Sequence, residues 1–218
     1  MPIFPASTAY GRRIPKQKFY ENLSVTPALR RIFTEQIESI TWSHKLSPAT
    51  VNVSKGELVE ELEVFHILLR QRGLDNAVLE LIDREIPYHI LFLLEFSGDF
   101  QARIGYKEPS GGKTTFKVDA YYQTDWMPQD TLPLSLAGLN LDAIYENFVR
   151  QLAGSNLVSG AESGTSLKDA VEQNKQRQKL LKQIAALENK IGREKQFNKQ
   201  VEFNEQLKDL KKQLRIFL

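Results

Sequence analysis

The last 53 residues of the chain carry two apolar stripes that are out of phase, and this limits the possible fold more than any other feature. The stripes consist of Leu180, Ile184, Leu187 and Ile191, and of Phe203, Leu207, Leu210, Leu214 and Phe217. Heptads counted from Ile184 reach Glu194, Asn198 and Val201 instead of Phe203. A chain reversal between Gly192 and Asn198 explains this break, so we predict an antiparallel helical hairpin over 167–218. The alternative is one continuous helix roughly 75 Å long, which would need a partner chain to bury its seam.

The composition before the hairpin changes in a way that divides the chain. Residues 154–166 are rich in Gly, Ser and Ala, which is typical of a flexible linker. Residues 21–153 have the length and the apolar content of an α/β core domain. Residues 1–20 contain Pro2, Pro5, Gly11 and Pro15, so we expect an extended N-terminal arm without regular structure.

The core segment alternates between strand and helix patterns. Thr26 and Pro27 are typical of a helix start, and a change to a strand is expected between Phe33 and Ile40. Strands are predicted at 63–69, 88–96, 100–106 and 116–122, with helices at 74–85 and 141–152. The strand at 88–96 is almost continuously apolar, which indicates a central position covered on both faces. The fold class is therefore mixed α+β: a small mixed or mainly antiparallel sheet with flanking helices, followed by the C-terminal hairpin.

The composition excludes several classes of protein. The chain has no cysteine, so it has no disulfide scaffold, no thiolate nucleophile and no cysteine zinc site. This fits a reducing compartment, and we expect a cytoplasmic location. No apolar run approaches the roughly 20 residues of a membrane span, and the start of the chain does not resemble a signal peptide.

Motifs for catalysis and for cofactor or metal binding are absent. Residues 110–114 read SGGKT, but Lys107 stands where a phosphate-binding loop needs its first glycine, so we interpret them as a hairpin turn. His44, His66 and His89 lack the spacing of a helical zinc site, and the last two are expected to be hydrogen-bonded structural residues. No nucleophile elbow occurs. We predict no catalytic residue, no metal site and no cofactor.

A divergent magnesium-dependent nuclease stays open as an alternative. Such an enzyme gathers carboxylates and a lysine on adjacent strands to hold the metal against a phosphate. The available side chains are Glu63, Glu95, Lys107, Lys117 and Asp119. No E-x-K triplet lies on a predicted strand, and Lys117 and Asp119 share a strand face in the reversed order.

Charge and aromatic residues indicate candidate binding surfaces. Residues 166–218 contain 13 Lys and Arg against 7 Asp and Glu, whereas residues 1–165 contain 16 against 20. This asymmetry indicates a nucleic-acid or acidic-partner surface, or lysines that simply solvate the hairpin. Residues 121–126 are dense in Tyr and Trp, which either form a binding surface or close the core. The candidate binding residues are Lys16, Lys18, Tyr121, Tyr122, Trp126, Lys208, Lys211 and Lys212.

Six segments carry a family resemblance. They are IPKQKFYENLSVTPALRRIF at 14–33, IPYHILFLLEF at 86–96, ARIGYK at 102–107, YYQTDW at 121–126, LDAIYENFVRQLAG at 141–154 and EKQFNKQVEFNEQLKDLKKQL at 194–214. With these segments the chain resembles the bacterial domain-of-unknown-function family 4391 over most of its length. The resemblance brings no catalytic residues. It implies an accessory role, because similar proteins are encoded near helicase and DNA-methyltransferase genes of defence or restriction-like loci.

These observations lead to one functional hypothesis with two rivals. The favoured hypothesis is an accessory, non-catalytic interaction subunit of a bacterial anti-phage defence or restriction-like complex. It would bind a larger helicase or methyltransferase through the hairpin, with nucleic acid contacted through the complex and a homodimer left open. The rivals are the nuclease and a direct nucleic-acid binder that uses the basic arm and tail. No membrane association is expected.

Overall fold

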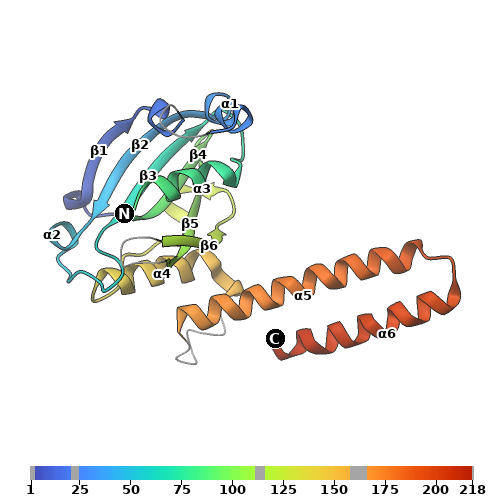
Figure 1. Ribbon diagram of the computed structural model, residues 1–218. Coiled ribbons are helices and arrows are strands. Elements are labelled where there is room, and N and C mark those ends of the chain that lie inside the picture. The colour runs from blue at the N-terminus through green and yellow to red at the C-terminus, as the bar shows by residue number, and fades with distance from the viewer. Residues whose placement is uncertain (1–2, 21–24, 111–115, 158–165, 218) are drawn as a thin grey trace. The chain divides into compact units, whose positions relative to one another are not determined.

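The structure is a computed structural model that describes residues 3–20, 25–110, 116–157 and 166–217. The chain is divided into two compact units, residues 1–153 and residues 154–218. The first unit holds the sheet and the second holds the helical hairpin (Figure 1). Together they confirm the predicted mixed α+β class.

A seven-stranded mixed sheet forms the centre of the first unit. Its strands are β1 (Ala9–Ile14), β2 (Ile37–Leu46), β3 (Leu62–Leu69), β4 (His89–Phe96), β5 (Asp99–Pro109), β6 (Phe116–Gln123) and β7 (Met127–Pro128). The strands from β1 to β6 follow one another in chain order across the sheet, and β7 pairs with β5. Within this sheet β3 and β4 run parallel, and the other neighbours run antiparallel. Parallel neighbours need a crossover connection, and α3 (Asn76–Glu85) supplies it.

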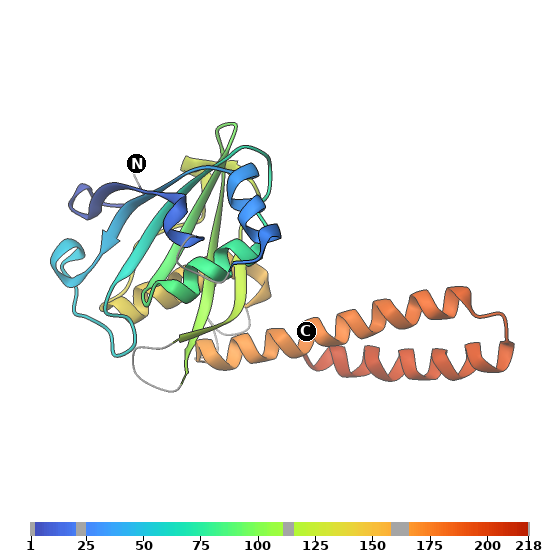
Figure 2. The same cartoon turned by 45° about the horizontal axis from the view of Figure 1, so that its top comes forward.

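Helices cover both faces of this sheet (Figures 1 and 2). On one face, α1 (Pro27–Glu35) and α3 pack over a core that includes Phe33, Phe65 and Phe92. On the other face, α4 (Leu141–Ala153) packs against β5 and β6. A short helix, α2 (Pro48–Val51), follows β2. Strand β4 is buried from His89 to Leu94, which confirms its predicted central position.

Local sequence signals set the ends of the helices. The Thr26 side chain accepts a hydrogen bond from Leu29 N, with proline at the first helical position, as expected for an N-cap. Asp75 caps α3 in the same way by accepting from Ala77 N. The predicted change from helix to strand occurs between Glu35 and Ile37. The short loop between β4 and β5 closes the predicted hairpin, with Ser97 and Gly98 at positive φ.

The N-terminal segment is more regular than the sequence indicated. Residues 1–20 were expected to lack regular structure, but β1 pairs with β2 as an edge strand, and Phe4 and Phe19 are buried. Pro5 and Pro15 flank the strand instead of interrupting it. Gly11 adopts a φ of 65°, and the pairing register shifts between Ala9 and Arg12. A bulge at glycine is a normal feature of an edge strand, so the expectation of an irregular arm was wrong.

The second unit is the predicted antiparallel hairpin. Helix α5 (Leu167–Arg193) and helix α6 (Phe197–Leu214) pack together and are joined by the turn at 194–196. The Glu194 carboxylate accepts hydrogen bonds from the backbone N–H groups of Lys195 and Gln196, both at 2.9 Å, and thereby fixes the turn. Phe197 starts the second helix, as the break in phase required. Most of the predicted linker, residues 158–165, lies outside the described residues.

Candidate functional site

The predicted basic residues of the N-terminal segment do not form a surface patch. Lys16 Nζ donates a hydrogen bond to Ile37 O at 2.6 Å, so it serves to hold the chain beside β2. Partial burial and then the nearby Arg70 and Arg13 lower the pKa of Lys16. Lys18 is exposed in the following 3₁₀ turn, and no ion pair of this side chain is found within the described residues.

The predicted aromatic cluster separates onto different parts of the sheet. Tyr121 and Tyr122 are neighbours on β6, so their side chains point to opposite faces. Tyr121 packs against the core below α3, and Tyr122 is buried. Trp126 also packs against that core, with the Arg72 guanidinium 5.5 Å from its ring centroid. The interpretation that these rings close the core therefore fits better than a shared binding surface.

The predicted lysines of the tail lie on α6. Lys208, Lys211 and Lys212 are all exposed, and Lys211 Nζ lies 2.8 Å from Glu188 Oε1 of α5. This contact links the two helices at the surface, where an ion pair contributes little stability. The three lysines share a helix with Glu205 and Asp209, so the surface has mixed charge.

The carboxylates considered for a nuclease are not gathered at one point. Glu95 pairs with His66 near the carboxyl end of β4, whereas Lys107 is buried beyond the other end of that strand. Glu63 is buried on β3, and burial together with the Glu61 carboxylate raises its pKa to about 8. Over residues 3–20, 25–110, 116–157 and 166–217, no group of three or more His, Asp or Glu side chains is arranged to hold a metal ion.

A buried polar network that sequence reasoning missed connects α3 with β5 and β6. Lys107 Nζ lies 2.9 Å from Asp83 Oδ1, and both side chains are at most 2% exposed. Tyr121 OH donates to Asp83 Oδ2 at 2.6 Å, and Lys107 Nζ donates to Tyr88 O at 2.6 Å. Burial raises the pKa of Asp83, while Lys107 and Tyr121 act in the opposite direction. The sequence signal was available, because Asp83 follows Leu79 by one turn on the buried stripe of α3.

A second buried group continues this network onto the opposite face of the sheet. Tyr145 OH of α4 donates to Gly105 O and accepts from Lys107 N, both at 2.8 Å. Its ring centroid lies 4.4 Å from that of His89, and Phe116 lies 4.8 Å from His89 on another side. His89 is 2% exposed, and burial followed by the Lys107 charge lowers its pKa to about 3. Its imidazole is therefore neutral at physiological pH.

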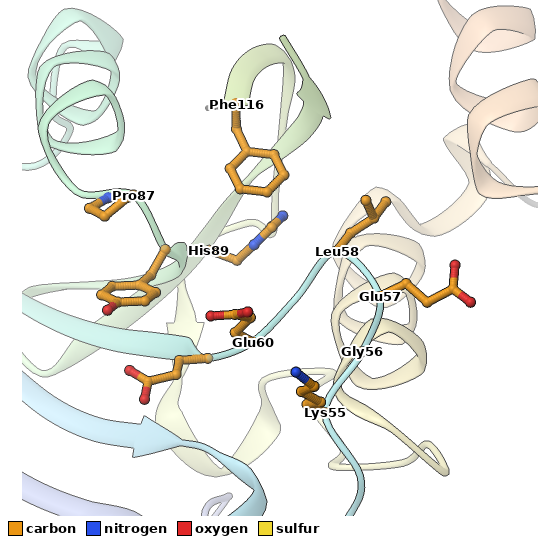
Figure 3. A pocket seen from close by; sticks show the side chains of 10 residues that line it. Lys55, Gly56, Glu57, Leu58, Glu60, Pro87, His89 and Phe116 are labelled. Carbon is orange, nitrogen blue, oxygen red and sulfur yellow. The ribbon is translucent and has the colours of Figure 1, made fainter. Parts of the chain in front are cut away.

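One cavity of the first unit lies beside His89 (Figure 3). It has a volume of about 780 Å³ and opens where β3, β4 and β6 begin. The loop before β3 contributes Lys55, Gly56, Glu57, Leu58, Glu60 and Glu61, and the remaining walls are Pro87, Tyr88, His89 and Phe116. Carboxylates, aromatic rings and one imidazole thus meet in a single hollow.

Helix α4 holds the loop that forms this wall. The Asp142 carboxylate accepts hydrogen bonds from the backbone N–H groups of Glu57, Leu58 and Val59, at 2.7, 3.2 and 2.7 Å. Gly56 lies so close to this carboxylate that a Cβ atom there would overlap it. The cavity wall is therefore a fixed structure, which is the usual condition of a ligand site.

A smaller cavity of about 360 Å³ lies over the other end of the sheet. His66 Nε2 and Glu95 Oε2 line it 2.6 Å apart, and the ring of Phe100 stacks on His66 with a centroid distance of 5.9 Å. His66 is the hydrogen-bonded structural histidine that the sequence predicted. His89, in contrast, makes no hydrogen bond through its side chain to any described residue, so that prediction was wrong for His89.

The hairpin carries a groove of its own. It has a volume of about 530 Å³ and runs between α5 and α6, lined by Gln183, Ala186, Leu187, Lys190, Gln206, Asp209 and Leu210. Leu187 of the first stripe and Leu210 of the second stripe both line it. In the part of the chain that the structure describes, no helix is both apolar enough and long enough to span a bilayer.

Comparison with known proteins adds a family but no activity. No curated protein and no solved structure matches the chain. The profile of one family, described as a domain of unknown function (DUF4391), matches residues 3–214 and so includes both units. The chain belongs to this family, as the resemblance of its segments predicted.

Proposed function

We propose that the protein is an accessory, non-catalytic interaction subunit and that its hairpin is the docking arm. The observation that carries the proposal is the incomplete burial of the hairpin's apolar stripes. Of the nine stripe residues, only Ile184 and Phe203 are buried. The others, which include Leu187 and Leu210, are half-buried along the groove or at the helix ends.

The two helices pack along their stripes but leave a groove between them, and an amphipathic helix is a suitable complement of such a groove. Full burial of one leucine side chain contributes about 1.5–3 kcal/mol relative to full exposure. The two half-buried leucines of the groove, Leu187 and Leu210, therefore favour an amphipathic helix of a partner. Further apolar contact is available at the turn, where Phe197 is 75% exposed and Val201 is 44% exposed.

The charge pattern of the hairpin favours a protein partner over nucleic acid. Its exposed lysines are interrupted by Glu172, Glu188, Glu202, Glu205 and Asp209. Carboxylates within the surface repel a phosphate backbone, whereas a protein helix with mixed charges can pair with both signs.

The class of partner is proposed from what the family resemblance implies. We propose a larger helicase or DNA methyltransferase of a bacterial defence or restriction-like complex, in the cytoplasm, with nucleic acid contacted through that partner. A second copy of the chain is the competing occupant of the groove.

The test uses two alanine positions that are neighbours on α5. Ala186 lines the groove and Ala185 does not, and both are exposed. Ala186→Glu places a charge in the groove, while Ala185→Glu places the same charge on the helix outside it. Tagged wild type and both variants are expressed in the native host, and co-purified proteins are quantified by mass spectrometry.

We expect a helicase or methyltransferase to co-purify with wild type and with Ala185→Glu. Its recovery with Ala186→Glu should fall about tenfold or more, because burying an unpaired charge costs several kcal/mol. Equal recovery with both variants would contradict docking through the groove. Co-purification of an untagged copy of the chain and of no other protein would indicate a homodimer and contradict the proposed partner.

The catalytic rival has its own test. Purified protein with Mg²⁺ or Mn²⁺ is expected to leave DNA and RNA uncut. Cutting that is lost in Glu95→Ala or Asp119→Ala would show that the protein is a nuclease and would overturn the proposal.

A further inference from the structure

Two cationic side chains meet at one backbone carbonyl near an end of the sheet. Lys16 follows β1, Ile37 begins β2 and Arg70 follows β3, and these three strands are neighbours in the sheet (Figure 1). Ile37 O accepts a hydrogen bond from Lys16 Nζ at 2.6 Å and another from Arg70 Nε at 3.4 Å. The sum of these distances limits the separation of the two nitrogen atoms to about 6 Å.

A third cation lies close to this pair. Arg13 is exposed near the end of β1, three residues before Lys16. Burial, followed by the charges of Arg70 and Arg13, lowers the pKa of Lys16, and the exposed carboxylate of Glu38 acts in the opposite direction. Lys16 thus belongs to a cluster with Arg13 and Arg70, although it does not form a patch with Lys18.

The charge of this cluster is not balanced by ion pairs. Among the residues that the structure describes, none of the three cations forms an ion pair. Arg72 and Asp99, which follow in β3 and β5 order along the chain, pair with each other at 3.4 Å and add no net charge. Three cations against the carboxylate of Glu38 leave an excess of two positive charges.

The hydrogen bonds to Ile37 O hold the pair in place and leave donors available. An ammonium group and a guanidinium group each carry several N–H donors, and each uses one of them on the carbonyl. Arg70 is exposed and Lys16 is half-buried, so a ligand from solvent can reach the remaining N–H groups. Like charges held this close repel each other, and a bound anion offsets that repulsion. The cluster is therefore arranged to receive an anion.

The charge and the donor types favour a phosphate group over a carboxylate. A phosphate monoester has a charge of about −1.5 to −2 at neutral pH and three strong acceptor oxygens on one centre, so it matches the excess charge. A single carboxylate carries half of that charge and fewer acceptor oxygens. Guanidinium groups also bind phosphate oxygens through two parallel hydrogen bonds, and the cluster contains two guanidinium groups.

We propose that Arg13, Lys16 and Arg70 form a binding site for a phosphate dianion. Because Arg13 and Arg70 are exposed, the site is open to solvent. The ligand is either the free ion or a phosphate monoester of a larger molecule. The site lies in the first unit and does not depend on the groove of the hairpin.

Isothermal titration calorimetry of the full chain at low ionic strength tests the site. The probes are inorganic phosphate, phenyl phosphate, dimethyl phosphate and malonate. Inorganic phosphate or phenyl phosphate is expected to bind. Dimethyl phosphate, which is a monoanion, and malonate, whose two charges lie on separate groups, are expected to bind at least tenfold more weakly. Binding of phenyl phosphate would assign a monoester ligand, and binding of inorganic phosphate alone would assign the free ion.

A pair of matched arginine variants makes the test specific. Arg70→Gln removes one charge of the cluster, and about tenfold weaker phosphate binding is expected, equivalent to about 1.4 kcal/mol. Arg84→Gln is the control, because Arg84 is an exposed arginine in the last turn of α3, outside the cluster.

A third variant is expected to act in the opposite direction. Glu38→Gln removes the carboxylate that opposes the three cations, so phosphate should bind about threefold more tightly, an effect typical of exposed charges. A variant that merely disturbed the fold would not bind phosphate more tightly.

The proposal would be overturned if neither inorganic phosphate nor phenyl phosphate bound, or if dimethyl phosphate or malonate bound as tightly as they do. It would equally be overturned if Arg70→Gln bound phosphate like Arg84→Gln, or if Glu38→Gln did not bind it more tightly than wild type. None of these results bears on the docking arm, whose test uses Ala186 and Ala185.

Discussion

Asp83 and Lys107 show how single residues place charge inside the sheet domain. Removing two ions from water costs several kcal/mol each, so such a pair persists only when other hydrogen bonds complete it. Tyr121 OH donates a hydrogen bond to the Asp83 carboxylate, and Tyr88 O accepts one from the Lys107 ammonium group. Because its members come from α3, β5 and β6, the network fixes the position of α3 relative to these two strands.

Removing one member of this pair should be costly. Lys107→Met leaves the Asp83 carboxylate buried without a cation, and we expect the free energy of unfolding to fall by about 3–5 kcal/mol. Urea denaturation followed by tryptophan fluorescence measures this, since Trp42 and Trp126 both lie in the first unit. Lys117→Met, at an exposed position of β6, is the control, with an expected change of about 0.5 kcal/mol or less. Equal stability of the two variants would show that the buried pair has no structural role.

Glu63 should make stability depend on pH. Its pKa is raised from 4.5 to about 8 by burial and by Glu61, so the folded protein binds more protons than the unfolded chain between these values. The free energy of unfolding should therefore fall as pH rises from about 4.5 to about 8, by on the order of 1 kcal/mol per pH unit. Glu63→Gln should remove the part of this decrease in unfolding free energy that is due to Glu63. The same pH dependence in the variant and in wild type would refute the assignment.

The sequence predicted the burial of residues wherever hydrophobic periodicity determines it. It placed the apolar run of β4 inside the sheet, and Phe65 and Phe92 lie in the core there. It did not predict the partner of Asp83, because an ion pair between a helix and a strand depends on tertiary packing. It also left open whether Tyr121 and Tyr122 form a surface, and strand geometry directs them to opposite faces.

At the scale of elements, the loop before β3 depends on α4. Ser54 O accepts a hydrogen bond from Leu141 N, and Asp142 then accepts three hydrogen bonds from the loop backbone. A contact over more than 80 residues of sequence has no local signal, which is why the cavity wall could not be predicted. The hairpin was predictable, because its break in phase is a local pattern.

Gly56→Ala tests this coupling of loop and helix. The added Cβ would overlap the Asp142 carboxylate, so the loop must move and we expect a loss of about 1–3 kcal/mol in the stability of the first unit. Gly192→Ala is the control, because a Cβ at Gly192 meets no atom within 4 Å and alanine favours the helix. An unchanged melting temperature for Gly56→Ala would show that the loop is not held by α4.

At the scale of the whole molecule, the two units carry different chemistry. The first has fixed cavities within a packed sheet domain, and the second has an open groove between two charged helices. The family profile includes both. The proposed docking function therefore concerns the second unit only.

The salt dependence of binding before and after deletion of residues 167–218 tests the docking claim most directly. Apolar burial changes little with salt, whereas each phosphate contact adds a log–log slope of about −0.9. We predict that wild type retains its protein partner with a shallow salt dependence and that the deleted chain loses it. The opposite result, in which deletion abolishes tight, salt-sensitive DNA binding and leaves partner binding intact, would contradict the account.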